Sequence, residues 1–219
     1  MKLYSYFRSS AAYRVRIALN LKGLAYDTVP IHLLNGGGEQ FSPEYRKLNP
    51  EGLVPALIDE SLPADDNVLT QSLAIIEYLE ETHPQPPLLP ADAAGRAHVR
   101  SLALAIACDI HPLNNLRVLR YLVRNLKVSE DDKNAWYRHW VELGLGALET
   151  RLAGDRRTGK FCFGDTPGLA DCCLVPQIFN AQRLNCDLSG MPTLLRINDA
   201  CSALDAFAAA APGVQPDAQ

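Results

Sequence analysis

The chain lacks several features that would assign it to a special class of protein. None of its apolar runs approaches the roughly 20 residues that a helix needs to cross a bilayer, although 47% of its 219 residues are hydrophobic. Its first residues, MKLYSYFR, lack the long apolar stretch of a signal peptide. The formal net charge of -4 provides no clustered positive charge for nucleic acid. We therefore expect a globular, cytoplasmic protein that binds neither membranes nor nucleic acid.

Cysteine is absent before residue 108, and the six cysteines from there on show no Cys-x-x-Cys spacing. This argues against a thioredoxin-type redox enzyme, which needs a low-pKa thiolate near its first strand-to-helix turn. Most of the cysteines are expected to be reduced core residues. The chain also lacks the tight His, Cys, Asp and Glu spacing of a metal site, so no metal is predicted.

The chain changes character at a cluster of four prolines between residues 84 and 90, where neither a helix nor a central strand can continue. Before the cluster, short apolar segments alternate in the order βαβ and then ββα. The predicted strands and helices there are 3–7, 10–22, 26–31, 43–48, 56–59, a strand near 68, and 72–81. We predict an α/β domain at 1–83, a linker at 84–90 and an all-helical domain at 91–219.

Helical spacing dominates the second half of the chain. One buried stripe is predicted at positions three and four apart, namely Val99, Leu102, Ala103, Ile106, Ile110 and Leu113. A second helix is predicted over 130–152, with inward residues Trp136, Trp140, Leu143, Ala147 and Leu148. Two more helices are predicted at about 168–183 and 192–209.

The first motif with chemical potential is Phe7-Arg8-Ser9-Ser10 at the end of the first strand. The two hydroxyl groups stand at the opening of a helix, whose unpaired amides and positive dipole end favour an anion such as a thiolate. The alternative is that Ser9 or Ser10 simply caps the helix and that the nearby arginines are solvated.

Two further motifs follow. If the bond of Val54-Pro55 is cis, the Val54 backbone groups turn outward and can pair with an extended peptide; an ordinary turn proline is the alternative. Gln71 and Ser72 stand directly before an apolar helix. Ser72 could cap that helix, or leave its free amides to a ligand carboxylate.

These motifs, in this order and spacing, resemble the glutathione transferase superfamily. The segments YSYFRSS and RVRIAL at its start resemble the zeta class, and so do QSLAIIEYLEE, HPLNN, FGD, LAD and LVPQ further along. The resemblance implies a thioredoxin-like glutathione-binding domain followed by an all-helical substrate domain, assembled as a homodimer. It also implies glutathione-dependent cis-trans isomerisation of a maleyl dicarboxylate, as in maleylacetoacetate isomerases.

The same resemblance implies the site residues. Ser9 or Ser10 donates a hydrogen bond to the glutathione sulfur. Ala11, where many zeta enzymes have cysteine, is also implied to contact glutathione. The remaining glutathione contacts are implied at Gln40, the Val54 backbone, Gln71, Ser72, His111 and Asn115. His111 and Asn115 are four residues apart and would share one helix face, unless the helix is kinked at Pro112 and they cap the break.

Arginines are the predicted ligands of the substrate carboxylates, because a guanidinium pairs a carboxylate with two parallel hydrogen bonds. Arg8 flanks the serines directly, and Arg117 and Arg183 resemble positions in glutathione-dependent maleylpyruvate isomerases, although each could be an ordinary exposed arginine. Three alternatives stay open: maleylpyruvate as the substrate, a transferase that conjugates or dehalogenates small electrophiles, and a binding protein without activity.

Overall fold

The computed structural model describes all 219 residues, and the chain divides into two compact units. The first unit comprises 1–88 together with 204–219, and the second comprises 89–203. This differs from the expectation that 91–219 form one helical domain. The C-terminal residues group with the first unit because α10 (Asp205–Ala208) packs on α1 (Ser10–Leu21) and buries Phe207.

The first unit is built around a four-stranded mixed sheet with the strand order β2-β1-β3-β4. β1 is parallel to β2 and antiparallel to β3, and β3 is antiparallel to β4. In chain order its elements are β1 (Lys2–Ser5), α1, β2 (Asp27–Pro30), 3-10 turns at Asn35–Gly37 and Glu39–Phe41, α2 (Pro43–Leu48), β3 (Ala56–Ile58), β4 (Val68–Thr70), α3 (Ser72–Thr82), α10 and a 3-10 turn at Pro212–Val214. The predicted thioredoxin-like arrangement is confirmed.

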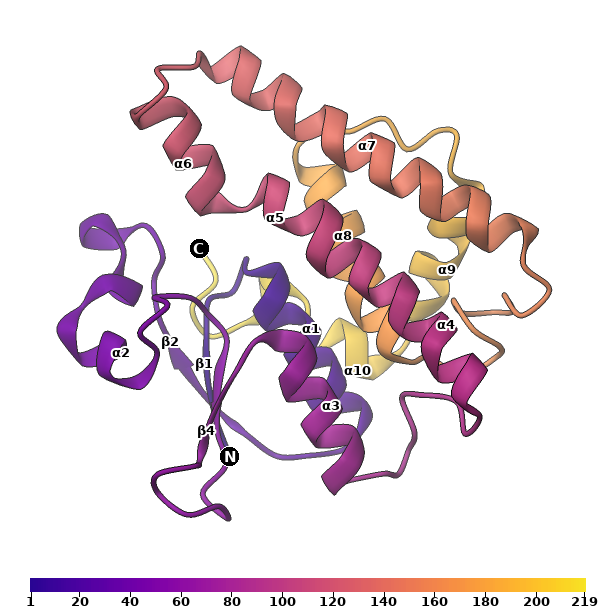
Figure 1. The fold of residues 1–219 in the computed structure, drawn as a ribbon, viewed down its shortest axis with the longest axis horizontal. Helices are drawn as coiled ribbons and strands as arrows, with labels where there is room; N and C mark the ends of the chain where they lie inside the picture. The colour runs from indigo at the N-terminus through magenta and orange to yellow at the C-terminus, as the bar shows by residue number, and fades with distance from the viewer. The chain divides into compact units, whose positions relative to one another are not determined.

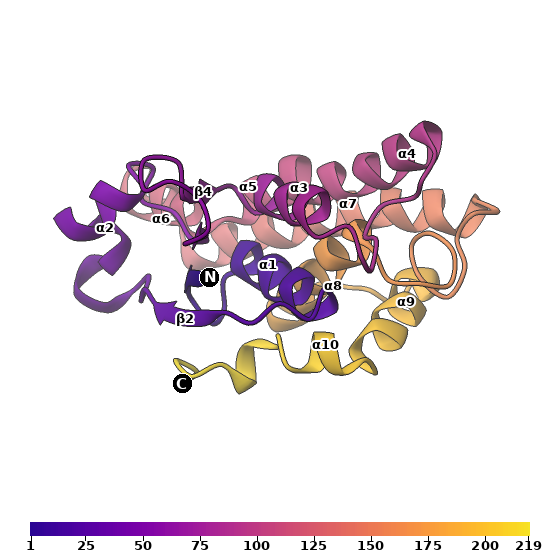
Figure 2. The ribbon, with the colours of Figure 1, turned by 90° about the horizontal axis from the view of Figure 1, so that it is seen from below.

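Local rules explain where these helices begin and end. Ser9 caps α1, and Ser42 caps α2 with Pro43 in its first turn. Gly23, at φ 65°, follows the end of α1. α1 and α3 lie together on one side of the strands, and α2 lies on the other side (Figures 1 and 2).

A buried ion pair fastens α1 to α3. Lys22 Nζ lies 2.8 Å from Glu80 Oε2, and both side chains are almost completely buried. Lys22 also donates to the carbonyl groups of His83 and Pro86, while Glu80 Oε2 accepts from the amide of Leu88. The pair therefore also holds the proline-rich segment that follows α3.

The second unit has only helices as regular elements, as predicted, and a single isolated β-bridge joins Thr158 and Gly164. Its elements are α4 (Ala93–Leu104), a π-helical segment (Ala105–Ile110), α5 (His111–Asn114), α6 (Leu116–Arg124), α7 (Glu130–Gly154), α8 (Leu169–Arg183) and α9 (Pro192–Ser202). α8 is buried along almost its whole length and packs against α4, α7 and α9. None of the helices of the chain combines the length and apolar content needed to cross a lipid bilayer.

Two sequence predictions for the helical unit are corrected. The helix predicted to run to about residue 209 ends at Ser202, and α10 forms separately in the first unit. The buried face of α7 contains Tyr137, Val141, Leu145 and Leu148, whereas Leu143 is exposed. The buried stripe is therefore displaced from the predicted one, although the helix itself is where the sequence placed it.

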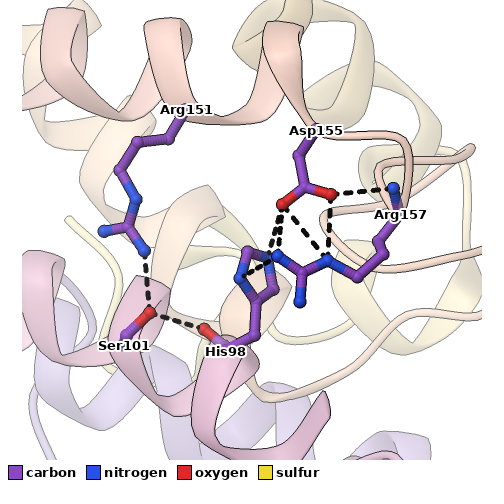
Figure 3. Close-up of polar contacts among 5 residues, drawn as sticks. All are labelled: His98, Ser101, Arg151, Asp155 and Arg157. Carbon is purple, nitrogen blue, oxygen red and sulfur yellow. Dashed lines mark hydrogen bonds and ion pairs between the residues drawn. The ribbon is translucent and has the colours of Figure 1, made fainter. Parts of the chain in front are cut away.

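A polar network joins α4 to the end of α7 (Figure 3). The Arg157 guanidinium donates to the Asp155 carboxylate at 2.6 Å and to His98 Nδ1 at 2.9 Å. Arg151 donates to the Ser101 hydroxyl at 2.7 Å, and that hydroxyl donates to the His98 carbonyl. Burial and the neighbouring Arg157 charge lower the pKa of His98, which keeps Nδ1 available as an acceptor.

Candidate functional site

Sheet register brings the predicted motifs of the first unit to one end of the sheet. Tyr4 in β1 pairs with Ala56 in β3, and Ala56 pairs with Thr70 in β4. The turn after β1, the Val54-Pro55 segment before β3 and the Gln71-Ser72 segment after β4 consequently leave the sheet at the same end. Strands are about 4.8 Å apart, so β1 and β4 are about 10 Å apart. An extended tripeptide has about this length.

Ser9 and Ser10 occupy different positions at the start of α1. Ser9 is the N-cap, and its Oγ accepts from the Ala12 amide at 3.2 Å. That contact uses a lone pair of the hydroxyl and leaves its hydrogen for another acceptor. Ser9 is partly exposed, whereas Ser10 is only 5% exposed, and Ala11 behind them is partly exposed. Capping and donation to a ligand are therefore compatible at Ser9.

Arg8 presents a positive charge beside these serines. Its guanidinium donates to the Tyr6 hydroxyl at 2.9 Å and lies 4.9 Å from the centre of the Phe7 ring. The aromatic pair holds the side chain in place, and none of the ion pairs of the chain involves Arg8. An anionic ligand group at this turn would meet a guanidinium that is not neutralised by a carboxylate.

Gln40 carries a buried polar atom without a partner. The residue is 4% exposed, and its Oε1 accepts no hydrogen bond. The loop approaches this side chain closely, because a Cβ on Gly38 would come within 2.6 Å of the Gln40 amide and Gly38 has φ 121°. An unpaired buried acceptor is unfavourable by about 1–3 kcal/mol, so a ligand N–H at this position would stabilise it.

The segment before β3 has the geometry that the second motif suggested. The Val54-Pro55 peptide bond is cis, and the Val54 amide and carbonyl take part in none of the backbone hydrogen bonds of the surrounding turn. The Val54 side chain belongs to an apolar cluster with Tyr6, Phe7 and Tyr45, and the Tyr45 hydroxyl donates to the Leu53 carbonyl at 2.6 Å. The backbone of Val54 thus remains available to an extended peptide.

The start of α3 has no side-chain cap. Gln71 is the N-cap residue at φ 65°, and its side chain donates to Glu51 Oε2 at 2.9 Å instead of capping the helix. Ser72 is the first helical residue, and its Oγ accepts from Arg14 Nη1 at 3.3 Å. The suggestion that Ser72 caps α3 is wrong. The first amides of α3 lack a side-chain acceptor, and they favour an anion.

The predicted shared face of His111 and Asn115 is corrected by the structure. α5 includes His111 but ends at Asn114, and Asn115 has an extended backbone. The Asn115 side chain caps α6 by accepting from the Arg117 amide at 3.0 Å. The helix therefore continues through Pro112 and breaks at Asn115, three residues later than the alternative placed the break, and Asn115 caps the helix that follows.

Arg117 and Arg183 are both exposed residues of the second unit. Arg117 lies in the first turn of α6, and Arg183 lies in the last turn of α8. Burial raises the pKa of the Tyr137 hydroxyl, and the charge and hydrogen bond of Arg183 partly offset this rise. Arg183 is thus beside Tyr137.

Sequence reasoning missed two residues that shape the end of the sheet. His32 Nδ1 accepts from the amides of Leu34 and Asn35, and its ring packs 5.0 Å from the Tyr6 ring. Asp217 accepts from the Phe7 amide at 2.9 Å. A lone histidine after a strand and an acid near the chain end carry no local pattern, so neither could be found without the tertiary contacts.

The polar groups at this end of the sheet suit an anionic peptide with a thiol. They offer a hydroxyl and a helix N-terminus for a thiolate, a free backbone segment for pairing, and uncapped amides for a carboxylate. No group of three or more His, Cys, Asp and Glu side chains in the chain is arranged to hold a metal ion.

Comparison with known proteins agrees with this geometry. The N-terminal and C-terminal domains of glutathione S-transferase match residues 3–87 and 141–211. A probable maleylacetoacetate isomerase of Vibrio cholerae is 53% identical, covering 99% of this chain and 97% of its own. A maleylpyruvate isomerase structure, described as a bacterial glutathione S-transferase in the zeta class, is 48% identical with a TM-score of 0.93 and full coverage of both chains.

A maleylacetoacetate isomerase from Methylobacterium extorquens, solved with bound malonate and glutathione, is 44% identical with a TM-score of 0.94 and full coverage of both chains. Identity at this level over the whole length extends the likeness beyond the fold. The chain therefore belongs to the zeta class of the glutathione S-transferase family.

Proposed function

We propose that this protein uses glutathione to isomerise the cis double bond of a maleyl dicarboxylate, with maleylacetoacetate as the substrate and fumarylacetoacetate as the product. Relatives named as maleylacetoacetate isomerases span nearly the whole chain. The observation that carries the proposal is a set of polar groups at one end of the sheet, namely the unpaired Gln40 acceptor, the Val54 backbone and the uncapped amides of α3, because they match the functional groups of glutathione.

Each of these groups supports one contact with glutathione. The buried Gln40 Oε1 suits a peptide N–H, and the Val54 backbone suits an extended cysteinyl-glycine segment. Gln71 and the uncapped amides at Ser72 suit the γ-glutamyl carboxylate. Ser9, with Ser10 as the second hydroxyl and Ala11 beside them, supports the sulfur.

Glutathione supplies the chemistry of the double bond: its thiolate adds to one carbon, rotation occurs about the resulting single bond, and elimination restores the alkene. The protein keeps the thiol ionised near neutral pH, because the Ser9 hydroxyl and the amides of α1 stabilise negative charge on sulfur. Arg8 binds carboxylate and developing enolate charge.

Arginines bind the substrate carboxylates in this proposal. Arg8→Ala should lower kcat and raise KM, whereas Arg117→Ala and Arg183→Ala should raise mainly KM, by about 10- to 100-fold for a lost charge-assisted contact. The increase should be larger for the diacid than for a monoacid analogue. Unchanged kinetics in all three variants would leave the conjugating transferase as the better description.

A double-mutant cycle tests whether the arginines act on one ligand. Arg8 belongs to the first unit, and Arg117 and Arg183 belong to the second. Residues that hold the same substrate should show a coupling of about 0.5–3 kcal/mol in kcat/KM, whereas independent residues should be additive within about 0.5 kcal/mol. If the effect of Arg8→Ala were additive with those of Arg117→Ala and Arg183→Ala, the three arginines would not share one carboxylate site.

The direct test is an absorbance assay with each cis diacid. Maleylacetoacetate and maleylpyruvate should be offered separately, with glutathione and with its S-methyl derivative, which cannot form a thiolate. The proposal predicts turnover with glutathione alone, without net consumption of thiol. The two substrates differ little in size, so their kcat/KM values should differ by only about 1–3 kcal/mol in transition-state binding, and the larger value identifies the preferred substrate. Stoichiometric loss of thiol would instead indicate conjugation.

We also place the protein in the cytoplasm as a homodimer. Glutathione transferases are typically dimeric, and the reduced cysteines of the chain suit a reducing compartment. Sedimentation that detects only monomer at micromolar concentration would contradict the dimer.

A further inference from the structure

The backbone of Phe7 is held on both sides by residues far from it in sequence. Its carbonyl accepts from Arg16 Nη2 at 3.0 Å, and its amide donates to Asp217 Oδ2 at 2.9 Å. Phe7 lies two residues before Ser9, in the turn that carries Arg8 and the serines. Both backbone hydrogen-bonding groups of this turn residue are therefore fixed by side chains outside the turn.

Arg16 and the C-terminal segment form a single attachment. The buried Arg16 guanidinium also donates to the Ser5 hydroxyl at 3.0 Å and to the Ala210 carbonyl at 2.9 Å. Burial lowers the pKa of Arg16 to about 10, which leaves it charged at neutral pH. One cation thus joins β1, the turn and the start of the C-terminal segment.

The residues after Ala210 lead back to the turn that contains Phe7. Gln215 Nε2 donates to the carbonyl groups of Ala209 and Ala211, which fixes the bend that leads to Asp217. Ala218 then packs against the apolar cluster that contains Phe7 and Val54. Figure 2 shows this segment running beneath α1 and β2 to the C-terminus.

We propose that Asp217 is a positioning residue for the thiolate site: its carboxylate fixes the Phe7 amide and thereby the placement of Arg8 and Ser9. This inference rests on the proposed function, because it assigns the serine turn to glutathione sulfur. Sites of this kind require placement within about 0.5 Å, and Asp217 restrains the Phe7 amide while Arg16 restrains the Phe7 carbonyl. Asp217 itself touches no reacting atom.

The unsatisfied half of the carboxylate points to positioning rather than stability. Asp217 Oδ1 is buried and has no hydrogen-bond partner. A buried charged oxygen left without a partner opposes the stabilisation gained by the other oxygen. Loss of Asp217 should consequently alter the site more than it alters the melting temperature.

The test compares Asp217→Ala, which removes the acceptor, with Asp217→Asn, whose amide oxygen can still accept from Phe7. The control is Asp65→Asn, which changes the same charge at an exposed loop position of the first unit. Asp217→Ala should raise KM for glutathione about 3- to 10-fold, as expected for one lost hydrogen bond, and raise the thiol pKa of bound glutathione measured by thiolate absorbance. Asp217→Asn and Asp65→Asn should remain within about twofold of the parent.

Amide hydrogen exchange tests the same inference without glutathione. The peptide that contains Phe7 should lose protection in Asp217→Ala and keep it in Asp217→Asn. If Asp217→Ala folds poorly, a chain ending at Pro216 replaces it in both measurements. Parent-like protection and KM in Asp217→Ala, or equal damage from alanine and asparagine, would overturn the positioning role. A parent protein that fails to ionise bound glutathione would refute the proposed function, and the exchange result would still decide the role of Asp217.

Discussion

Replacing Ser9 by alanine separates its role as the cap of α1, which the structure shows, from its proposed role as a donor to the glutathione sulfur. The Ser9 hydroxyl caps α1 through the Ala12 amide at 3.2 Å, so its loss should destabilise the protein by about 1 kcal/mol. For a chain of this size that corresponds to a fall in Tm of about 2–4 °C. If the hydroxyl also donates to the sulfur, kcat/KM should fall by about 10²–10³ as for an oxyanion donor.

The matched control is Ser129→Ala. Ser129 caps α7 by accepting from the Asp132 amide at 3.1 Å, so this variant loses an equivalent cap in the second unit. It should lower Tm similarly and leave turnover unchanged. Ser9→Thr keeps a hydroxyl and should recover most of the activity, and Ser10→Ala should lose less than Ser9→Ala because Ser10 is more buried. A Ser9→Ala enzyme with a reduced Tm but parent kcat/KM would show that Ser9 is only a cap.

Two further predictions concern stability. Lys22→Met should lower the free energy of unfolding by about 3–5 kcal/mol in a urea titration, because Glu80 is left buried without its partner. Lys2→Met, at an exposed ion pair, should have little effect. Equal losses of stability in the two variants would contradict this reasoning. The pKa of folded His98 is depressed by burial and by Arg157, so the unfolded chain binds more protons as pH falls below about 6.5. The free energy of unfolding should therefore decrease as pH falls through this range. His98→Asn, which keeps an acceptor for Arg157, should flatten this pH dependence in urea unfolding. If the variant showed the same pH dependence as the parent, His98 would not be its cause.

Strand and helix positions in the first unit could be predicted because local signals and tertiary packing agree there. Ser9 and Gly23 delimit α1 in the sequence and in the structure. Pro43 marks the first turn of α2. Each signal has a short-range physical cause, a cap, a left-handed residue or a missing amide, which does not depend on the rest of the fold.

The buried face of α7 could not be predicted in the same way. Two stripes of this helix have helical spacing, one through Trp136 and Leu143 and the other through Tyr137 and Val141. Hydrophobicity favours the tryptophans, yet Trp136 is only partly buried, and its indole N–H donates to the Leu113 carbonyl at 2.8 Å. Which stripe faces the core depends on the neighbouring helices, and the sequence of α7 alone does not contain that information.

The segment around His111 illustrates a different limit. The apolar stripe of α4 continues into a π-helical segment, and only then does the chain break into α5 and α6. The π-helical segment precedes both His111 and Asn115, so it turns them together around the axis. The rule that residues four apart share a face fails for this pair because the helix ends at Asn114 and Asn115 has an extended backbone. The rule holds for Val99 and Ala103 on the regular part of α4.

The exceptions to local rules in the first unit gather where the function is proposed. Gln71 adopts a positive φ although it is not glycine, and a strained backbone of this kind is unfavourable by about 1–3 kcal/mol. Gln40 buries an unpaired acceptor, and α3 begins without a side-chain cap. A protein selected for stability alone would remove such features, for instance with an aspartate cap in place of Gln71. Their concentration at one end of the sheet is expected if a bound peptide satisfies these groups, and glutathione should accordingly raise Tm in the parent more than in a Gln40→Leu variant.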